Sequence, residues 1–305
     1  MLEIRPDLQN AYNSLCYQGE QFPEPHQLIQ LDGPTFIDPN RGEVPIKIDG
    51  EVLAAQGTLY VGDSLLRQSL EEHGVRAETW QEATSFLDYH LDPSAEELVW
   101  GFSGYATGGF DSEGKPYGYA EEAEYLQALY EYLEASDQLP SLAIDGGVSE
   151  GFLALNSVIA KSIHVPTLGF LPREGLDSAG IRDHMVVAGE TYPDREALVA
   201  TADMFAFAGG AAATIRECQK AVKNGASGLI FWHEKYGAES LPNVLDRYKD
   251  LQEALSDGRL AVCKSSAEIP EQVEKLLQKK CESQPHPKNR SHCRLFEIAD
   301  YRLHD

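Results

Sequence analysis

Short apolar runs alternate with segments of helical periodicity between residues 98 and 280, and this alternation limits the possible fold more than any other feature. Short apolar runs bounded by turn residues are typical of buried strands. The expected strands are residues 98–102, 141–144, 165–170, 204–208, 229–232 and 260–263, and the expected helices are residues 119–134, 152–162, a segment that begins at Thr214, and 269–280. Strands that alternate with helices pair in parallel and carry helices on both faces of the sheet. We therefore predict an α/β fold over residues 96–281, a Rossmann-like, doubly wound and mostly parallel sheet.

Three of the expected strands end in turns of small residues, and such turns let a ligand approach the backbone. In parallel α/β sheets the strand ends share one edge, where ligands bind. After the third turn, three alanines lead to a helix, whose first N–H groups can donate to a phosphate. The predicted phosphate- or nucleotide-binding residues are Ser103, Gly104, Asp145, Gly146, Gly147, Gly209, Gly210, Ala211, Ala212, Ala213 and Thr214.

Two of these positions have a plain structural alternative. Thr214 and Glu217 have the spacing of a capping box, in which Thr214 is the N-cap and Glu217 only stabilises the helix start. Asp145 has the position either of a ligand to a ribose hydroxyl or of the first residue of an Asx-turn. The sequence leaves both alternatives open.

Four motifs occur in an order found in one known family. They are G-F-S-G at residues 101–104, G-G followed by a third glycine at 146–151, G-F-L-P at 169–172, and A-G-G-A-A-A-T-I-R-E at 208–217. This order resembles the "lysine decarboxylase-like" Rossmann fold of the LONELY GUY cytokinin-activating enzymes. The wider superfamily of those enzymes includes nucleotide-sensing domains and molybdenum-cofactor carrier proteins.

The resemblance implies two catalytic residues. In the resembled enzymes an arginine of an R-K pair and the glutamate of T-x-x-E cleave the base from a nucleoside monophosphate, and the matching positions here are Arg195 and Glu217. A carboxylate can stabilise an oxocarbenium-like state and activate water, while arginine can orient that carboxylate or bind a phosphate. Asp194 and Glu196 flank Arg195, so the alternative is a solvated, salt-bridging arginine at a helix start.

The same motifs also depart from the family pattern. Glu196 stands where the family has lysine, Ala208 replaces a proline, and two alanines stand near the glycine that precedes the threonine. Despite these departures, the resemblance implies an N-glycosidase, a phosphoribohydrolase acting on a nucleoside 5'-monophosphate or a related nucleotide. The alternative is a non-catalytic nucleotide or cofactor carrier or sensor of the same fold, which the lost lysine and altered loop favour.

The composition narrows the class of partners. The formal net charge of −24 argues against nucleic-acid polymers and anionic membranes as partners, because both require basic patches. No apolar stretch reaches membrane-spanning length and the first 20 residues lack a signal-peptide pattern. The five cysteines form no paired framework, so we expect a cytoplasmic protein. We also expect the protein to bind a small-molecule nucleotide, to need no cofactor and to form a homodimer.

The two ends of the chain are not explained by the resemblance. For residues 1–95 we expect a small α/β appendage, with short strands within 31–52, a strand at 58–61 and a helix at 64–73. Residues 282–305 form a tail that is less acidic than the rest of the chain. Two cysteines and two histidines at 281–293 have poor zinc spacing, so we predict no metal site.

Overall fold

The fold is known from a computed structural model. It describes residues 2–6, 8–16, 35–38, 42–45, 58–61, 77–79, 98–105, 109–110, 116–117, 119–148, 150–178, 180, 182–187 and 190–283. The helix expected at residues 64–73 and the tail after residue 283 lie outside these described residues.

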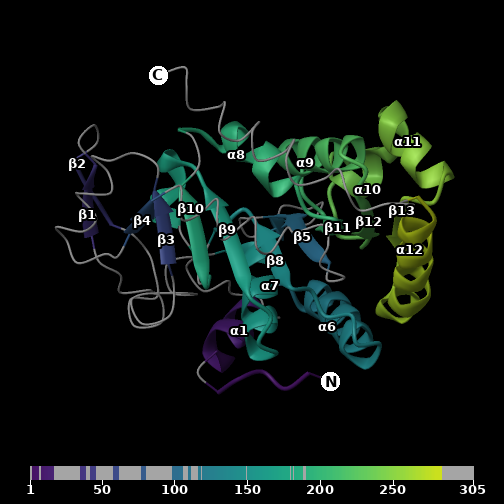
Figure 1. The fold of residues 1–305 in the computed structure, drawn as a ribbon, viewed down its shortest axis with the longest axis horizontal. Helices are drawn as coiled ribbons and strands as arrows, with labels where there is room; N and C mark the ends of the chain where they lie inside the picture. The colour runs from purple at the N-terminus through teal and green to yellow at the C-terminus, as the bar shows by residue number, and fades with distance from the viewer. Residues whose placement is uncertain are drawn as a thin grey trace.

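The molecule is built around one nine-stranded sheet in which every neighbouring pair of strands is parallel (Figure 1). The strand order is β13-β12-β11-β5-β8-β9-β10-β3-β4. The strands are β3 (Thr58–Val61), β4 (Ala77–Thr79), β5 (Val99–Gly104), β8 (Leu142–Asp145), β9 (Thr167–Leu171), β10 (His184–Val187), β11 (Met204–Ala208), β12 (Ser227–Phe231) and β13 (Leu260–Cys263). The predicted Rossmann-like α/β fold is confirmed.

Helices cover both faces of this sheet (Figure 1). One face carries α1 (Gln9–Leu15), α6 (Ala120–Ala135), α7 (Gly151–Ser162) and α12 (Ile269–Ser283). The other face carries α8 (Tyr192–Val199), α9 (Ala212–Lys223), α10 (Leu241–Val244) and α11 (Lys249–Ser256). The remaining elements are the two-stranded pairs β1 (Thr35–Asp38) with β2 (Gly42–Pro45) and β6 (Gly109–Phe110) with β7 (Pro116–Tyr117), and the 3-10 turns η1 (Arg173–Ser178), η2 (Leu245–Arg247) and η3 (Ser266–Glu268).

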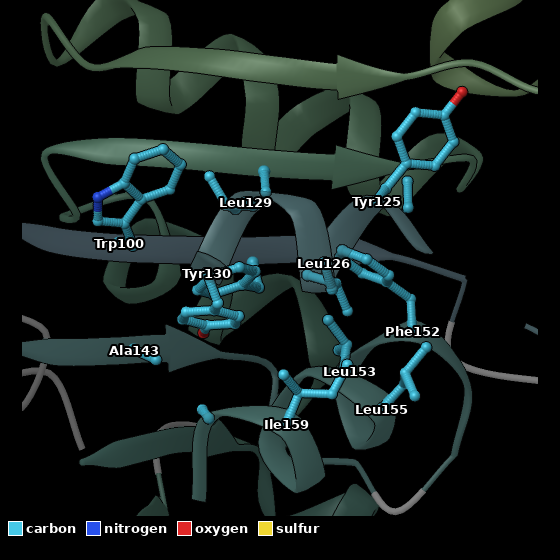
Figure 2. Packing of buried hydrophobic residues seen from close by; sticks show 14 of the residues in the cluster. Trp100, Tyr125, Leu126, Leu129, Tyr130, Ala143, Phe152, Leu153, Leu155 and Ile159 are labelled. Carbon is cyan, nitrogen blue, oxygen red and sulfur yellow. The ribbon is translucent and has the colours of Figure 1, made fainter. Parts of the chain in front are cut away.

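The core forms because the central strands are apolar on both sides. In β5, Val99 packs toward α8–α11, whereas Trp100 and Phe102 pack toward α6 and α7. Figure 2 shows the layer on the α6 and α7 side, with Trp100, Tyr130 and Phe152 labelled. The Phe102 ring links these three, with ring centroids 6.4, 6.0 and 6.5 Å away. The Tyr130 hydroxyl is buried but donates a 2.8 Å hydrogen bond to Asn156 Oδ1. Both layers therefore keep water away from the strand interiors, as a parallel sheet requires.

The N-terminal strand that we predicted at residues 58–61 continues the main sheet. β3 pairs in parallel with β10, and β4 pairs with β3. Strands β1 and β2 confirm short strands within residues 31–52. The domain boundary near residue 95 stays a prediction.

One expected helix start is wrong. Helix α9 begins at Ala212 with Ala211 as N-cap, and Thr214 is the third helical residue. Alanine has the highest helix propensity, so Ala212 and Ala213 extend the helix toward its N-terminus. Strand β10 and helix α11 were not predicted from the sequence at all.

Candidate functional site

The side of the sheet on which successive strands are added changes between β5 and β11. After β5 the strands β8, β9 and β10 are added on one side, and after β11 the strands β12 and β13 are added on the other. Helix α6 follows β5 on one face, and α9 follows β11 on the opposite face. Such a switch point, at the carboxyl ends of the strands, is where open α/β sheets bind ligands.

The three small-residue turns lie along this one edge, as predicted. Gly104 at the end of β5 is paired with Ala208 at the end of β11, and β8 flanks β5 on its other side. The Tyr105 amide donates to the carbonyl of Ala208 at 3.2 Å, and its carbonyl accepts from the Phe152 amide at the start of α7 at 2.9 Å. These bonds hold the ends of β5 and β11 and the start of α7 together.

The turn between β11 and α9 depends on two glycines in the left-handed region. Gly209 has a φ of +57° and Gly210 a φ of +73°, and a Cβ on Gly210 would overlap the Thr214 side chain. Ala211, Ala212 and Ala213 are exposed, and no side chain of the described residues caps the helix. The N-terminus of α9 is thus open toward solvent, with the positive end of the helix dipole and its free amides at the surface.

Glu217 lies inside the site, so the capping-box alternative for this residue is wrong. Its side chain is 4% exposed and accepts a hydrogen bond from the hydroxyl of Ser103, which is itself buried on β5. Burial raises the pKa of Glu217, while the nearby Arg195 charge and the Ser103 hydrogen bond oppose this shift without cancelling it. Glu217 is therefore a stronger base than an ordinary surface glutamate.

Arg195 is buried against the neighbouring strands, so the solvated alternative for this residue is also wrong. It is 6% exposed, its Nη1 donates to the Phe170 carbonyl at 3.4 Å, and its guanidinium lies 5.2 Å from the Tyr192 ring centroid. A Cβ on Gly146 would overlap Nη1, so the guanidinium packs directly on the β8–α7 turn. Its Nε is buried without a hydrogen-bond partner, and Arg195 makes no ion pair with any described residue.

The acidic neighbours of Arg195 in the sequence are engaged elsewhere. Asp194 closes a capping box with Thr191 at the start of α8. Glu196 is buried and forms ion pairs with Arg216 at 2.7 Å and Lys220 at 2.8 Å. Neither carboxylate neutralises Arg195.

Asp145 forms the Asx-turn that was one of its two alternatives. Its Oδ1 accepts a 2.6 Å hydrogen bond from the Gly147 amide, and its carboxylate forms a 2.9 Å ion pair with Arg182. Arg182 is 1% exposed and also donates to the carbonyls of Val148 and Leu153. Both carboxylate oxygens of Asp145 thus bind other groups of the protein, and Asp145 supports the turn from beneath.

Neither Arg182 nor the aromatic residues at this edge of the sheet could be recognised in the sequence. A charged residue at the end of an apolar strand indicates that Asp145 needs a buried cation, but not which one. The ring of Tyr105 packs on Gly209 and lies 5.9 Å from the Tyr236 ring, and the Tyr236 hydroxyl donates to buried Glu122 at 2.7 Å. No motif marks these residues in the sequence.

No cluster of three or more potential metal ligands occurs among the residues that the structure describes. Within the same residues, no helix is both long and apolar enough to cross a bilayer.

The comparisons with known proteins give similar structures only. No family model matches the chain, and no curated protein matches it. One similar solved structure is the molybdenum cofactor binding protein of the phototrophic bacterium Rippkaea orientalis, at 17% identity and a TM-score of 0.45, covering 60% of this chain and 99% of that one. Another is the molybdenum cofactor carrier protein of Chlamydomonas reinhardtii, at 17% identity and a TM-score of 0.42, with the same coverage.

These likenesses do not show membership of the LONELY GUY family, which stays a prediction. The Rossmann-like α/β fold follows from the strand order of the sheet itself.

Proposed function

We propose that the protein is a phosphoribohydrolase, which hydrolyses the N-glycosidic bond of a nucleoside 5'-monophosphate. The observation that carries this proposal is the state of Arg195. It is a buried guanidinium with an unpartnered Nε and no ion pair among the described residues, near the buried carboxyl of Glu217. A buried charge that is only partly compensated is expensive, and an anionic ligand is the simplest further compensation.

The phosphate of the substrate binds at the turn between β11 and α9. The left-handed glycines expose the backbone there, and the uncapped N-terminus of α9 presents free amides and a positive dipole end. The exposed alanines leave room for the phosphate oxygens. This placement brings the ribose of the substrate toward Ser103 and Glu217.

The chemistry uses Glu217 and one water molecule. The bond between C1' and the base nitrogen breaks, and its electron pair leaves with the base, which takes up the proton that Glu217 removes from water. The Glu217 carboxylate stabilises the oxocarbenium-like sugar and accepts a proton from water as the water oxygen bonds to C1'. The products are the free base and ribose 5-phosphate. Ser103 holds the carboxylate in place through its hydrogen bond.

A second candidate function is a non-catalytic nucleotide or cofactor carrier. The specific observation in its favour is Glu196, which occupies the position of the family lysine and is fully engaged with Arg216 and Lys220. The chain thus has no lysine at that position to act on a substrate.

One experiment separates the two functions. The purified protein is incubated with a panel of purine and pyrimidine nucleoside 5'-monophosphates, and free base and ribose 5-phosphate are quantified by chromatography. The proposal expects release of base from at least one of them. Tight retention of one nucleotide without turnover of any would establish the carrier instead.

A further inference from the structure

Two Arg-Glu dipeptides, identical in order, face each other across α8 and α9. Arg195-Glu196 lies on α8, and Arg216-Glu217 lies on the first half of α9. Glu196 pairs with Arg216, whereas Arg195 lies near enough to Glu217 for its charge to lower the pKa of that carboxyl. One pair is therefore bonded and the other is held apart.

The bonded pair forms the α8–α9 clamp, which consists of Glu196, Arg216 and Lys220. Glu196 Oε1 accepts from Arg216 Nε at 2.8 Å and contacts Nη2 at 2.7 Å, while Oε2 accepts from Lys220 Nζ at 2.8 Å. The Glu196 side chain is 3% exposed, but those of Arg216 and Lys220 are 46% and 39% exposed. The clamp thus closes from the solvent side onto a buried carboxylate.

We propose that Glu196 is a positioning residue, which acts through the α8–α9 clamp to hold Arg195 beside Glu217. This inference rests on the proposed function, because Arg195 and Glu217 are the groups that serve the substrate. The backbone link is short, since Arg195 and Glu196 are neighbours on α8, so a shift of the helix at Glu196 also moves Arg195. Two cations engage Glu196, so it cannot turn to neutralise Arg195, and the guanidinium stays available for an anion.

The clamp also sets the charge around Glu217. The groups that face this carboxyl are Arg195 and Glu196 from α8, Ser103 from β5, and Lys220 from α9. Arg195 and Lys220 lower the pKa of Glu217, and Glu196 raises it. If the clamp opens and Arg195 moves away, the pKa of Glu217 rises.

The test compares two substitutions on α9. Arg216→Gln removes the two guanidinium contacts to Glu196 Oε1, whereas Lys223→Gln removes one positive charge from an exposed lysine outside the clamp. We expect Arg216→Gln to lower turnover on the accepted monophosphate by about tenfold, a typical loss when a reacting group is misplaced. The acidic limb of its pH–rate profile should shift to higher pH. Lys223→Gln should match the wild type, and Arg216→Lys should recover most of the lost turnover.

A binding measurement keeps the inference testable if no monophosphate is hydrolysed. The affinity for ribose 5-phosphate is measured by calorimetry at low ionic strength in the wild type, Arg216→Gln, Arg195→Met and the double variant. If Glu196 acts by positioning Arg195, Arg216→Gln should weaken binding when it is introduced alone. It should have no further effect when it is added to Arg195→Met. Equal losses in both backgrounds, or unchanged turnover, pH profile and affinity in Arg216→Gln, would overturn the inference.

Discussion

Two buried arginines lie at the same edge of the sheet, both near Asp145, but their bonding partners differ. Arg182 makes an ion pair with Asp145 and hydrogen bonds to two carbonyls. Arg195 makes one long bond to the Phe170 carbonyl, and its Nε has no partner. The first arginine is compensated by the fold, and the second is compensated only in part.

This difference distinguishes a buried charge that stabilises the fold from a buried charge that is retained for function. A buried ion pair with all its hydrogen bonds satisfied maintains the fold, and removing one partner is strongly destabilising. A buried charge without a partner is a cost to the fold, which proteins retain mainly at functional sites. The comparison therefore predicts opposite consequences for similar substitutions at the two arginines.

The largest effect is expected from Arg182→Met. It leaves Asp145 buried without its cation, so the free energy of unfolding should fall by roughly 3–5 kcal/mol. Urea unfolding followed by circular dichroism measures this loss. Adding Asp145→Asn should recover part of the stability, because the uncompensated charge is removed. A loss below about 1 kcal/mol in the single variant would contradict the structural role of this pair.

Arg195→Met should not lower the free energy of unfolding, in contrast to Arg182→Met. It removes a poorly compensated buried charge and keeps much of the side-chain volume, so stability should be unchanged or higher. Turnover on the accepted monophosphate should fall by about 10²–10³-fold, the usual loss for a charged group that stabilises a transition state. Steady-state kinetics and thermal unfolding on the same preparation check both halves. A variant that unfolds as readily as Arg182→Met would remove the distinction between the two arginines.

Glu217→Gln should lower turnover by roughly a hundredfold with little change in substrate affinity. Its effect on stability depends on pH. The pKa of Glu217 in the folded state is raised above its value in the unfolded state. The free energy of unfolding of the wild type therefore falls as the pH rises through the folded pKa. Glutamine cannot ionise, so the variant should be more stable than the wild type at pH 8, and this gain should shrink toward pH 5. Thermal melts across that range test the sign.

The smallest effect is expected from Gly146→Ala. A methyl group there overlaps Nη1 of Arg195 and displaces the guanidinium, so affinity for ribose 5-phosphate should fall by about tenfold. Gly237→Ala is the matched control, because a Cβ at that position meets no atom within 4 Å. Calorimetry that shows equal affinities for the two variants would mean that the position of Arg195 has no influence on the binding of ribose 5-phosphate.

The fold could be predicted from the sequence because its strands are strongly apolar and its helices strongly periodic. Strand β11, M-F-A-F-A, is buried at every residue and was located to the residue. Strand β10, H-M-V-V, was missed because it is short and only its two middle residues are buried. Helix α11 was missed because it follows directly on α10 and η2, without a clear turn between them.

The site could be predicted less completely. Local motifs indicated Ser103, Arg195 and Glu217, and the structure brings all three to one edge of the sheet. The bonding of each charge could not be derived, because it depends on side chains far apart in the sequence. Asp145 pairs with an arginine 37 residues away, and Glu217 bonds to a serine 114 residues away.

The central pairing of the sheet also determines when the chain can fold during synthesis. Trp100 of β5 pairs with Met204 of β11, and Leu59 of β3 pairs with Met185 of β10. At elongation rates of roughly 5–20 residues per second, β5 waits several seconds for its partner strand to leave the ribosome. During that interval the backbone edge of β5 that pairs with β11 lacks its partner, and Val99 lacks the helices α8–α11 against which it packs. Nascent chains of this protein should therefore stay sensitive to protease until β11 has emerged.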